Sequence, residues 1–316
     1  MADALYGEDG FYRHSSASRH FRTSPHASTL FAAALRRLAD EVDAALGQPD
    51  PFDIVDVGAG DGDLLHALAA AAPRRWRLTA VEMAPRINSR MRWRLDIPRC
   101  AGLLVANEWL DNVPCDVVER AADGLRLVRT DGSLGPPPAA ADVEWLTRWW
   151  PLTAVGARAE VGRSRDEAWA AAVRQLDRGV AVAIDYAHER AARPSHGTLT
   201  GYRAGRQVPP VADGSCDLTA HVALDACAAA ADVAGTLLTT QRRALRALGV
   251  RADRPAYGGD PLGYLAALSA AGEAAELCDP AGLGGFGWLV QSVGTALPAV
   301  FTATTSAGPG PARHLA

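Results

Sequence analysis

The sequence predicts an α/β fold built on a parallel sheet, for two reasons. Apolar segments of strand length recur at residues 52–57, 77–82, 102–107 and 180–185, and the last three end in acidic or amide residues. The first segment runs into a glycine-rich turn and then a helix from about Asp63, where β-branched residues give way to Leu and Ala at helical spacing. Strand, tight turn and helix are the opening of a βαβ unit, which predicts parallel neighbouring strands.

The other expected elements follow from local patterns in the same chain. A helix over residues 31–46 has apolar residues at helical spacing and ends at Gly47. Asp217 and Thr219 are expected to begin a later helix as capping residues. Residues 91–98 are predicted to form a short third strand, and residues 123–138 a hairpin with a surface loop. A helix is predicted over residues 261–271 and a strand over residues 286–294.

Three glycines, Gly58, Gly60 and Gly62, follow the first strand. They allow a turn tight enough for backbone N–H groups and the next helix N-terminus to approach a ligand. A dinucleotide-binding turn would place its third glycine at position 63, but this chain has Asp63 there, and Asp61 adds a second negative charge. The turn therefore disfavours a pyrophosphate.

An acidic residue on the first strand, Asp56, favours a cationic ligand near the turn. S-adenosylmethionine (SAM) fits, because it carries an ammonium and a cationic sulfur. A structural turn with no ligand is the alternative. Glu82 ends the second strand, 22 residues after Gly60, where a carboxylate can accept hydrogen bonds from both ribose hydroxyls. Dinucleotide-dependent and SAM-dependent enzymes share this acidic residue, so Glu82 predicts a cofactor that contains adenosine but does not distinguish a dinucleotide from SAM.

Polar residues at the ends of two later strands are candidates for the reaction itself. Asn107 and Glu108 end one strand, with Asp111 three residues later, and Asp185 and His188 follow the next. Ligands of open α/β sheets bind at the carboxyl ends of the strands, so these groups are expected to line the cleft. Helix capping is the alternative for Asp111, and capping or a core hydrogen bond is the alternative for His188 and for His221.

Composition excludes several functional classes. A net charge of −4 gives no electrostatic reason to expect nucleic acid as a partner. All 32 basic residues are arginine, which excludes a phosphate-binding P-loop, a pyridoxal Schiff base and a lysine nucleophile. The five cysteines are scattered and the histidines lack ligand spacing, so neither a disulfide framework nor a metal site is expected. No segment resembles a signal peptide or a membrane span, which predicts a cytoplasmic protein without a membrane partner.

Several blocks of the chain together resemble the MidA-like family of SAM-dependent methyltransferases, whose mitochondrial member is an arginine methyltransferase that assists assembly of respiratory complex I. The blocks, in order, are "HFRTSPHASTLFA", "VDVGAGDGDLL", "VANEWLDNVPCDVVE", "IDYAHE", "GTLTGYR" and "DLTAHV". The resemblance implies a class I methyltransferase fold, a doubly wound, mostly parallel sheet of seven strands with helical additions. It also implies that Gly58 and Gly60 approach the methionine part of SAM, that Glu82 holds the ribose, and that Asn107 and Glu108 border the sulfonium and the acceptor.

The chain departs from the family pattern in its N-terminal block and in the block that begins "DLTAHV". His20 and His26 stand where the family carries acidic residues, and Ala223 replaces a later Asp. These changes bear on the substrate more than on the cofactor. We expect residues 1–47 to form an N-terminal arm and helix that act as a lid, residues 48–304 to form the methyltransferase domain, and residues 305–316 to be a disordered tail.

The expected reaction is methyl transfer from SAM to a protein, with arginine as one candidate, or to a small molecule. Glu108, with Asp111 or Asp185, is expected to orient a cationic or polar acceptor, while His188 or His221 removes a proton. A homodimer is also considered. A non-catalytic SAM-binding assembly factor, which binds another protein through the tryptophan-rich segment 142–151, is the alternative function; a core or lid helix is the alternative for that segment. A nicotinamide oxidoreductase is disfavoured by the acidic turn.

Overall fold

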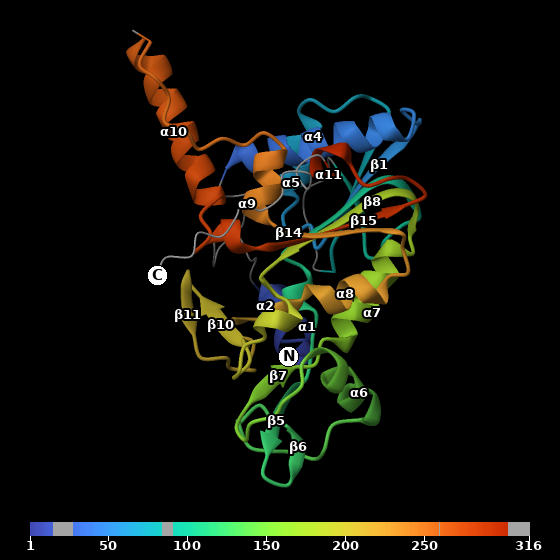
Figure 1. Cartoon of the computed structure of the whole chain (residues 1–316), viewed down its shortest axis with the longest axis vertical. Helices are drawn as coiled ribbons and strands as arrows, with labels where there is room; N and C mark the ends of the chain where they lie inside the picture. The colour runs from blue at the N-terminus through green and yellow to red at the C-terminus, as the bar shows by residue number, and fades with distance from the viewer. Residues whose placement is uncertain (15–27, 84–90, 259, 303–316) are drawn as a thin grey trace, which may run out of the picture.

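The computed structural model describes residues 1–14, 28–83, 91–258 and 260–302. Its centre is a seven-stranded sheet in the order β14-β15-β8-β4-β1-β2-β3 (Figure 1). Only β15 runs against its neighbours, so the predicted doubly wound, mostly parallel sheet is confirmed. In chain order the strands are β1 (Phe52–Val57), β2 (Trp76–Val81), β3 (Arg92–Arg94), β4 (Cys100–Asn107), β8 (Leu176–Asp185), β14 (Gly235–Thr240) and β15 (Gly287–Val293).

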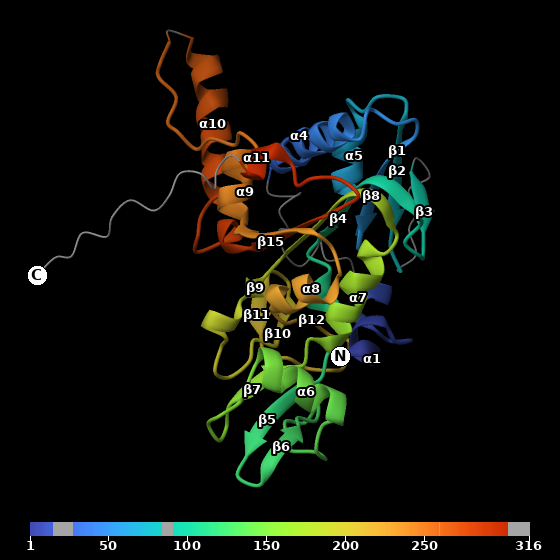
Figure 2. The same cartoon turned by 45° about the vertical axis from the view of Figure 1, so that its right-hand side comes forward.

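Helices cover both faces of this sheet, because alternate side chains of the buried strands point to opposite sides. In β4, Leu103 and Val105 belong to the core on one face, and Leu104 and Ala106 to the core on the other. Figures 1 and 2 show helices on both sides of the sheet. Those that contribute to the first core are α4 (Thr29–Ala45), α5 (Asp63–Ala69), α9 (Gln241–Ala247), α10 (Pro261–Leu277) and α11 (Ala299–Thr302), and those that contribute to the second are α7 (Arg163–Val173) and α8 (Leu224–Ala230).

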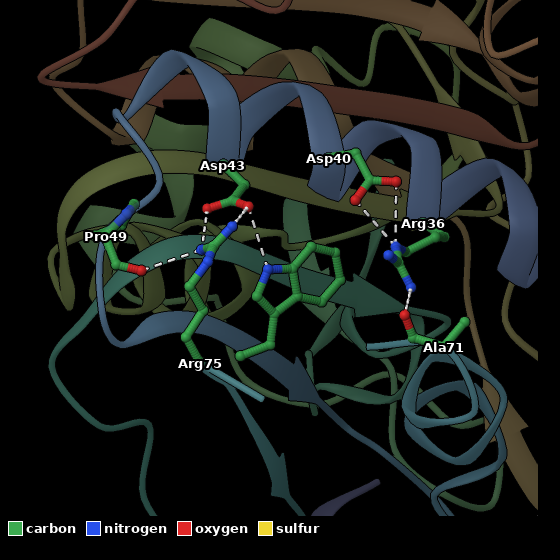
Figure 3. Close-up of polar contacts among 7 residues, drawn as sticks. Arg36, Asp40, Asp43, Pro49, Ala71 and Arg75 are labelled. Atoms are coloured by element: carbon green, nitrogen blue, oxygen red, sulfur yellow. Dashed lines mark hydrogen bonds and ion pairs between the residues drawn. The ribbon is translucent and has the colours of Figure 1, made fainter. Parts of the chain in front are cut away.

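A polar cluster attaches α4 to the segment that leads into β2 (Figure 3). The buried Asp43 carboxylate accepts hydrogen bonds from the Arg75 guanidinium and, at 3.3 Å, from Trp76 Nε1. The hydrogen bonds from Arg75 hold the pKa of Asp43 below its usual value. One turn earlier, Arg36 pairs with Asp40 at 3.0 Å on the exposed side of the same helix. The cluster thus holds α4, which also contacts α5 and β4, against the start of β2.

Two additions leave the sheet from the carboxyl ends of β4 and β8. The first contains the hairpin β5–β6, the helix α6 and the strand β7, with Trp145 and Trp150 buried in a small core that also includes Ala223 and Ala226. The tryptophan-rich segment is therefore a core helix of this addition. The second contains the sheet β11-β10-β12 and the short parallel pair β9–β13. Their bounds are β5 (Val117–Ala121), β6 (Gly124–Leu127), α6 (Ala140–Trp149), β7 (Arg158–Glu160), β9 (Ala187–His188), β10 (Thr200–Arg203), β11 (Arg206–Val208), β12 (Asp217–Thr219) and β13 (Val222–Ala223).

One sequence prediction is wrong in this second addition. Asp217 and Thr219 do not begin a helix; they form β12, which pairs antiparallel with β10, and the next helix begins at Leu224. Both side chains are buried and make hydrogen bonds with residues more than a hundred positions away instead of capping the local backbone. Local pattern could not separate these two uses of the same residue types.

The N-terminal segment is packed onto the second addition. Helices α1 (Ala2–Tyr6) and α2 (Phe11–His14) place Leu5 and Phe11 in a small core with Leu218 of β12. The substitutions at His20 and His26 and the expected tail, residues 305–316, lie outside the described residues. Within the part of the chain that the structure describes, no helix is both long enough and apolar enough to span a membrane.

Candidate active site

The carboxyl ends of β1, β2, β4 and β8 meet at one edge of the sheet, where they bring the predicted polar residues together. The turn after β1 has left-handed backbone at Gly58, with φ 72°, and Gly60, with φ 56°. A Cβ atom on Gly58 would lie 2.8 Å from Cδ1 of Trp109, whereas a Cβ atom on Gly60 would meet nothing within 4 Å. The Gly60 N–H donates to Oε2 of Glu82 at 3.0 Å. The turn therefore leaves open space at Gly60, directly beside the Glu82 carboxylate.

Asp56 lies beneath this space, at the end of β1, and its residue is only 3% exposed. Burial, together with the negative charge of Glu82, raises the pKa of Asp56 to about 8. A carboxyl group in such a position is stabilised in its charged form by a nearby cation. The edge of the sheet at β1 and β2 is thus suited to a positively charged ligand.

Asn107 and Glu108 form the wall of the site at the end of β4. Glu108 has left-handed backbone with φ 51°, which is uncommon for a residue with a side chain, and its N–H donates to the carbonyl of Ile184 at 2.8 Å. Asn107 Nδ2 donates to Glu108 Oε1 at 3.2 Å. Asn107 Oδ1 is buried and has no hydrogen-bond partner among the described residues. A buried acceptor of this kind is normally satisfied by water or a ligand.

Asp185 is fully buried at the end of β8, and its carboxyl group accepts hydrogen bonds from backbone N–H groups of the site. Its Oδ2 accepts from the N–H groups of Leu110 and Asp111, at 2.9 and 3.2 Å, and its Oδ1 accepts from the N–H of Tyr186 at 3.0 Å. Burial, with the negative charges of Asp111 and Glu108, raises the pKa of Asp185 well above its usual value. These bonds fix the 3₁₀ turn, η2 (Leu110–Asn112), that carries Asp111.

Asp111 is the carboxyl group that this turn presents. Its Oδ2 accepts from the Thr219 hydroxyl at 2.6 Å, and its Oδ1 is buried without a partner among the described residues. Burial raises the pKa of Asp111, although the Thr219 hydrogen bond and the Arg165 charge act in the opposite direction. Arg165 is itself buried and donates from Nη2 to the backbone carbonyl of Asp111 at 2.8 Å. A fixed carboxyl group with one open oxygen is suited to receive a hydrogen-bond donor.

Two residues that sequence reasoning did not place in the site lie beside Asp111. Asp217 accepts from Asn112 Nδ2 at 3.1 Å and from the Tyr12 hydroxyl at 2.9 Å. Burial, and then the charge of Asp111, raises the pKa of Asp217 to about 7. Tyr12 comes from the N-terminal segment, so this segment contributes directly to the carboxyl cluster. No local motif could reveal contacts that span 105 and 205 positions.

The two candidate histidines lie on the other side of the cluster. Nδ1 of His188 is 2.7 Å from Nη1 of Arg193. Because a guanidinium can only donate, Nδ1 accepts, and the ring proton is on Nε2. Burial and the Arg193 charge lower the pKa of His188 to about 3, and burial lowers the pKa of His221, which stacks on Tyr186 with ring centroids 5.5 Å apart. His188 is therefore arranged as a hydrogen-bond donor, contrary to its expected role of removing a proton.

Comparison with known proteins identifies the family. A family model described as "Putative S-adenosyl-L-methionine-dependent methyltransferase" matches residues 67–241, more than half of the chain. The chain belongs to this family. The enzyme is thus a SAM-dependent methyltransferase, as expected from the acidic turn and from the family resemblance, and the expected cofactor is confirmed.

Two solved structures from Burkholderia thailandensis are similar over most of the chain. One is a COG1565 superfamily member bound to S-adenosyl-homocysteine, with 26% identity and a TM-score of 0.78, covering 94% of this chain and 88% of its own. The other, an uncharacterized protein of the same superfamily, has 27% identity and a TM-score of 0.77, with 94% and 87% covered. No curated protein matches the chain. The class I methyltransferase architecture is therefore shared along nearly the whole length.

Proposed function

We propose that this methyltransferase transfers the methyl group of SAM to a cationic or strongly polar acceptor that donates hydrogen bonds, with a protein arginine side chain as the acceptor that suits the site best. The observation that carries this proposal is the unpaired Oδ1 of Asp111, a buried carboxylate oxygen without a partner among the described residues. Glu108, at the end of β4, and Asp217, on β12, add carboxyl groups near Asp111. A guanidinium, which offers a planar set of donors, is the side chain that paired carboxylates recognise best.

The residues around the glycine turn suit the cofactor. Gly58 and Gly60 bring the backbone close to the methionine part, Glu82 accepts from the ribose, and Asp56 places negative charge near the ammonium. The free Oδ1 of Asn107 offers a further acceptor beside the reacting centre. When bound, SAM supplies a methyl group on a cationic sulfur. Asp61, on the same turn, remains a candidate contact for the cofactor.

The residues at the ends of β4 and β8 would hold the acceptor in line with the methyl group. Glu108 and Asp111 orient the acceptor nitrogen and reduce its positive charge, which exposes a lone pair for attack. Transfer of the methyl group from the cationic sulfur to this nitrogen would leave the sulfur neutral, and Asp111 would accept the proton that the nitrogen releases. Asp185 acts as a positioning residue through its bonds to the backbone of η2. His188, with its proton on Nε2, would donate a hydrogen bond to the protein segment that carries the methyl acceptor. His221 would line the site as an uncharged side chain.

Binding and transfer measured separately test this proposal. Asp111→Asn and Glu108→Gln are titrated with S-adenosylhomocysteine (SAH) and assayed for transfer from labelled SAM to arginine-containing proteins of a cell lysate. Asp131→Asn, an exposed aspartate outside the site, is the matched control. We expect near-normal SAH binding in all three variants and transfer at least about 100-fold slower in the two site variants. Normal transfer by Asp111→Asn would exclude its assigned role, and label on small molecules alone would exclude a protein acceptor.

A further inference from the structure

Two tyrosine hydroxyls of the N-terminal segment are linked to the turn that carries Asp111. The Tyr12 hydroxyl donates to Oδ2 of Asp217 at 2.9 Å, and Oδ1 of the same carboxyl group accepts from Asn112 Nδ2 at 3.1 Å. The Tyr6 hydroxyl donates to the backbone carbonyl of Asn112 at 3.3 Å. Asn112 directly follows Asp111 in η2. The N-terminal segment therefore contacts η2 both directly and through Asp217.

Packing of the N-terminal segment holds these two hydroxyls in place. Leu5 and Phe11 are buried in the small core that includes Leu218 of β12. The rings of Tyr6 and Tyr12 stack on each other, with centroids 5.5 Å apart and planes inclined by 22°. Close-packed aromatic rings have few alternative rotamers, so each hydroxyl is directed at its acceptor before a substrate arrives.

The turn η2 is also held by a segment from the body of the fold. Arg165 of α7 donates from Nη2 to the carbonyl of Asp111 at 2.8 Å and from Nε to the carbonyl of Val113 at 3.2 Å. The N-terminal segment holds Asn112, which lies between these two residues. Two segments that are distant in the chain thus fix three consecutive residues, and the Asp111 carboxyl group lies on the first of them.

We propose that Tyr6 and Tyr12 are positioning residues for methyl transfer, and that the docked N-terminal segment orients the Asp111 carboxyl group through Asn112 and Asp217. This inference rests on the proposed role of Asp111 in binding the methyl acceptor. Asp217 is the link that the geometry supports best, because it is fully buried and each of its two oxygens accepts a hydrogen bond. Donors on both oxygens stabilise the charged form of a carboxyl group.

The same hydrogen bond makes the cluster sensitive to pH. Asp111 on η2, Tyr6 on α1 and Tyr12 on α2 face Asp217. Burial and the charge of Asp111 raise the pKa of Asp217 to about 7, whereas the hydrogen bonds from Tyr12 and Asn112 act in the opposite direction. Burial raises the pKa of both tyrosines, so each keeps its proton at neutral pH. Removal of the Tyr12 hydroxyl should therefore raise the pKa of Asp217 further.

Melting temperatures at two pH values test the link to Asp217 without a substrate. Tyr12→Phe removes only the hydroxyl, and Tyr257→Phe, which changes a 62% exposed tyrosine outside the cluster, is the matched control. A higher pKa of Asp217 in the folded state means that more stability is lost as pH rises through it. Tyr12→Phe should therefore lower the melting temperature by about 2 °C more at pH 8 than at pH 5, but not in an Asp217→Asn background. An effect that is equal at both pH values would overturn the link.

Methyl transfer tests the positioning role itself. Label from SAM is followed into every component of a cell lysate, so the assay does not require an arginine acceptor. Tyr6→Phe and Tyr12→Phe should bind SAH normally but transfer about 10-fold more slowly, and Tyr257→Phe should match the wild type. Because a charged Asp217 favours a cationic acceptor, the acid limb of the rate profile should move to higher pH in Tyr12→Phe.

An Asp111→Asn variant in the same assay separates this inference from the proposed function. If Asp111→Asn is slow while Tyr6→Phe and Tyr12→Phe keep the wild-type rate and pH profile, the tyrosines have no positioning role and the proposed function stands. Normal transfer by Asp111→Asn would instead remove the role of Asp111 on which the inference rests. Slow transfer by all three variants, with unchanged SAH affinity, is the result that we expect.

Discussion

The hydroxyl of Thr219 donates to Oδ2 of Asp111 at 2.6 Å, although the two residues lie 108 positions apart in the chain. Oδ1 of the same carboxyl group is buried without a hydrogen-bond partner among the described residues. Thr219→Val should retain the shape of the side chain but release Asp111, so methyl transfer should fall by about 10-fold. SAH titration should show unchanged cofactor affinity. Thr147→Val, on the exposed side of α6, is the control, and equal transfer by both variants would refute a positioning role for Thr219.

The glycine turn should be intolerant of a side chain at Gly58. In Gly58→Ala, the added Cβ would lie 2.8 Å from Trp109 Cδ1 in a backbone with φ 72°. The turn must shift, so SAH affinity should fall at least about 10-fold. Gly132→Ala adds a side chain at a similar φ of 80°, but in a different turn and with nothing within 4 Å of the new atom, so SAH affinity should not change. Calorimetric titration compares the two variants, and equal SAH affinity in them would contradict the assignment.

The stability of the unliganded enzyme should depend on pH through Asp56. Its pKa rises from 3.8 to about 8 on folding, so the folded state holds this proton more tightly than the unfolded state. The contribution to stability is complete below about pH 4 and is lost as pH rises toward about 8. Asp56→Asn has no proton to lose, so its melting temperature should fall less than that of the wild type between pH 5 and pH 8. Parallel melting curves for the wild type and the variant would count against this role of Asp56.

The cluster around Asp43 should stabilise the fold, unlike the exposed pair one turn earlier. The Asp43 side chain is 6% exposed and accepts from Arg75 and Trp76, whereas the Asp40 side chain is 52% exposed. Asp43→Asn should lower the free energy of unfolding by about 1–3 kcal/mol, and Asp40→Asn by no more than about 0.5 kcal/mol. Urea denaturation measures both. An equal effect of the two substitutions would mean that the buried contacts of Asp43 add nothing to the free energy of unfolding.

Much of the central sheet could be predicted from the sequence, because buried parallel strands are short apolar runs that end at a glycine or a polar group. The strand over 52–57, the helix from Asp63 and the position of Glu82 all follow from this pattern. The cofactor choice also rested on local residues, since Asp61 and Asp63 disfavour a phosphate. These features are encoded within about 30 consecutive residues of the chain, so a single sequence is sufficient to reveal them.

The acceptor side could be predicted only in part, because it depends on contacts between distant segments. Asp111 was a candidate from its position after β4, but its partner Thr219 was assigned to a helix start. The structural role of Asp185 and the proton position on His188 depend on geometry that no local pattern encodes. Tyr12 and Asp217 meet through packing of the N-terminal segment, which the sequence suggested only as a lid.

The cofactor site is tested most directly by calorimetric titration of the wild type and Glu82→Ala with SAH, with NADH as the competing ligand. We expect micromolar SAH binding by the wild type, at least about 10-fold weaker binding by the variant because two hydrogen bonds to the ribose are lost, and no binding of NADH by either protein. Equal SAH affinity in the two proteins, or preferential binding of NADH, would contradict a SAM site at the carboxyl ends of β1 and β2.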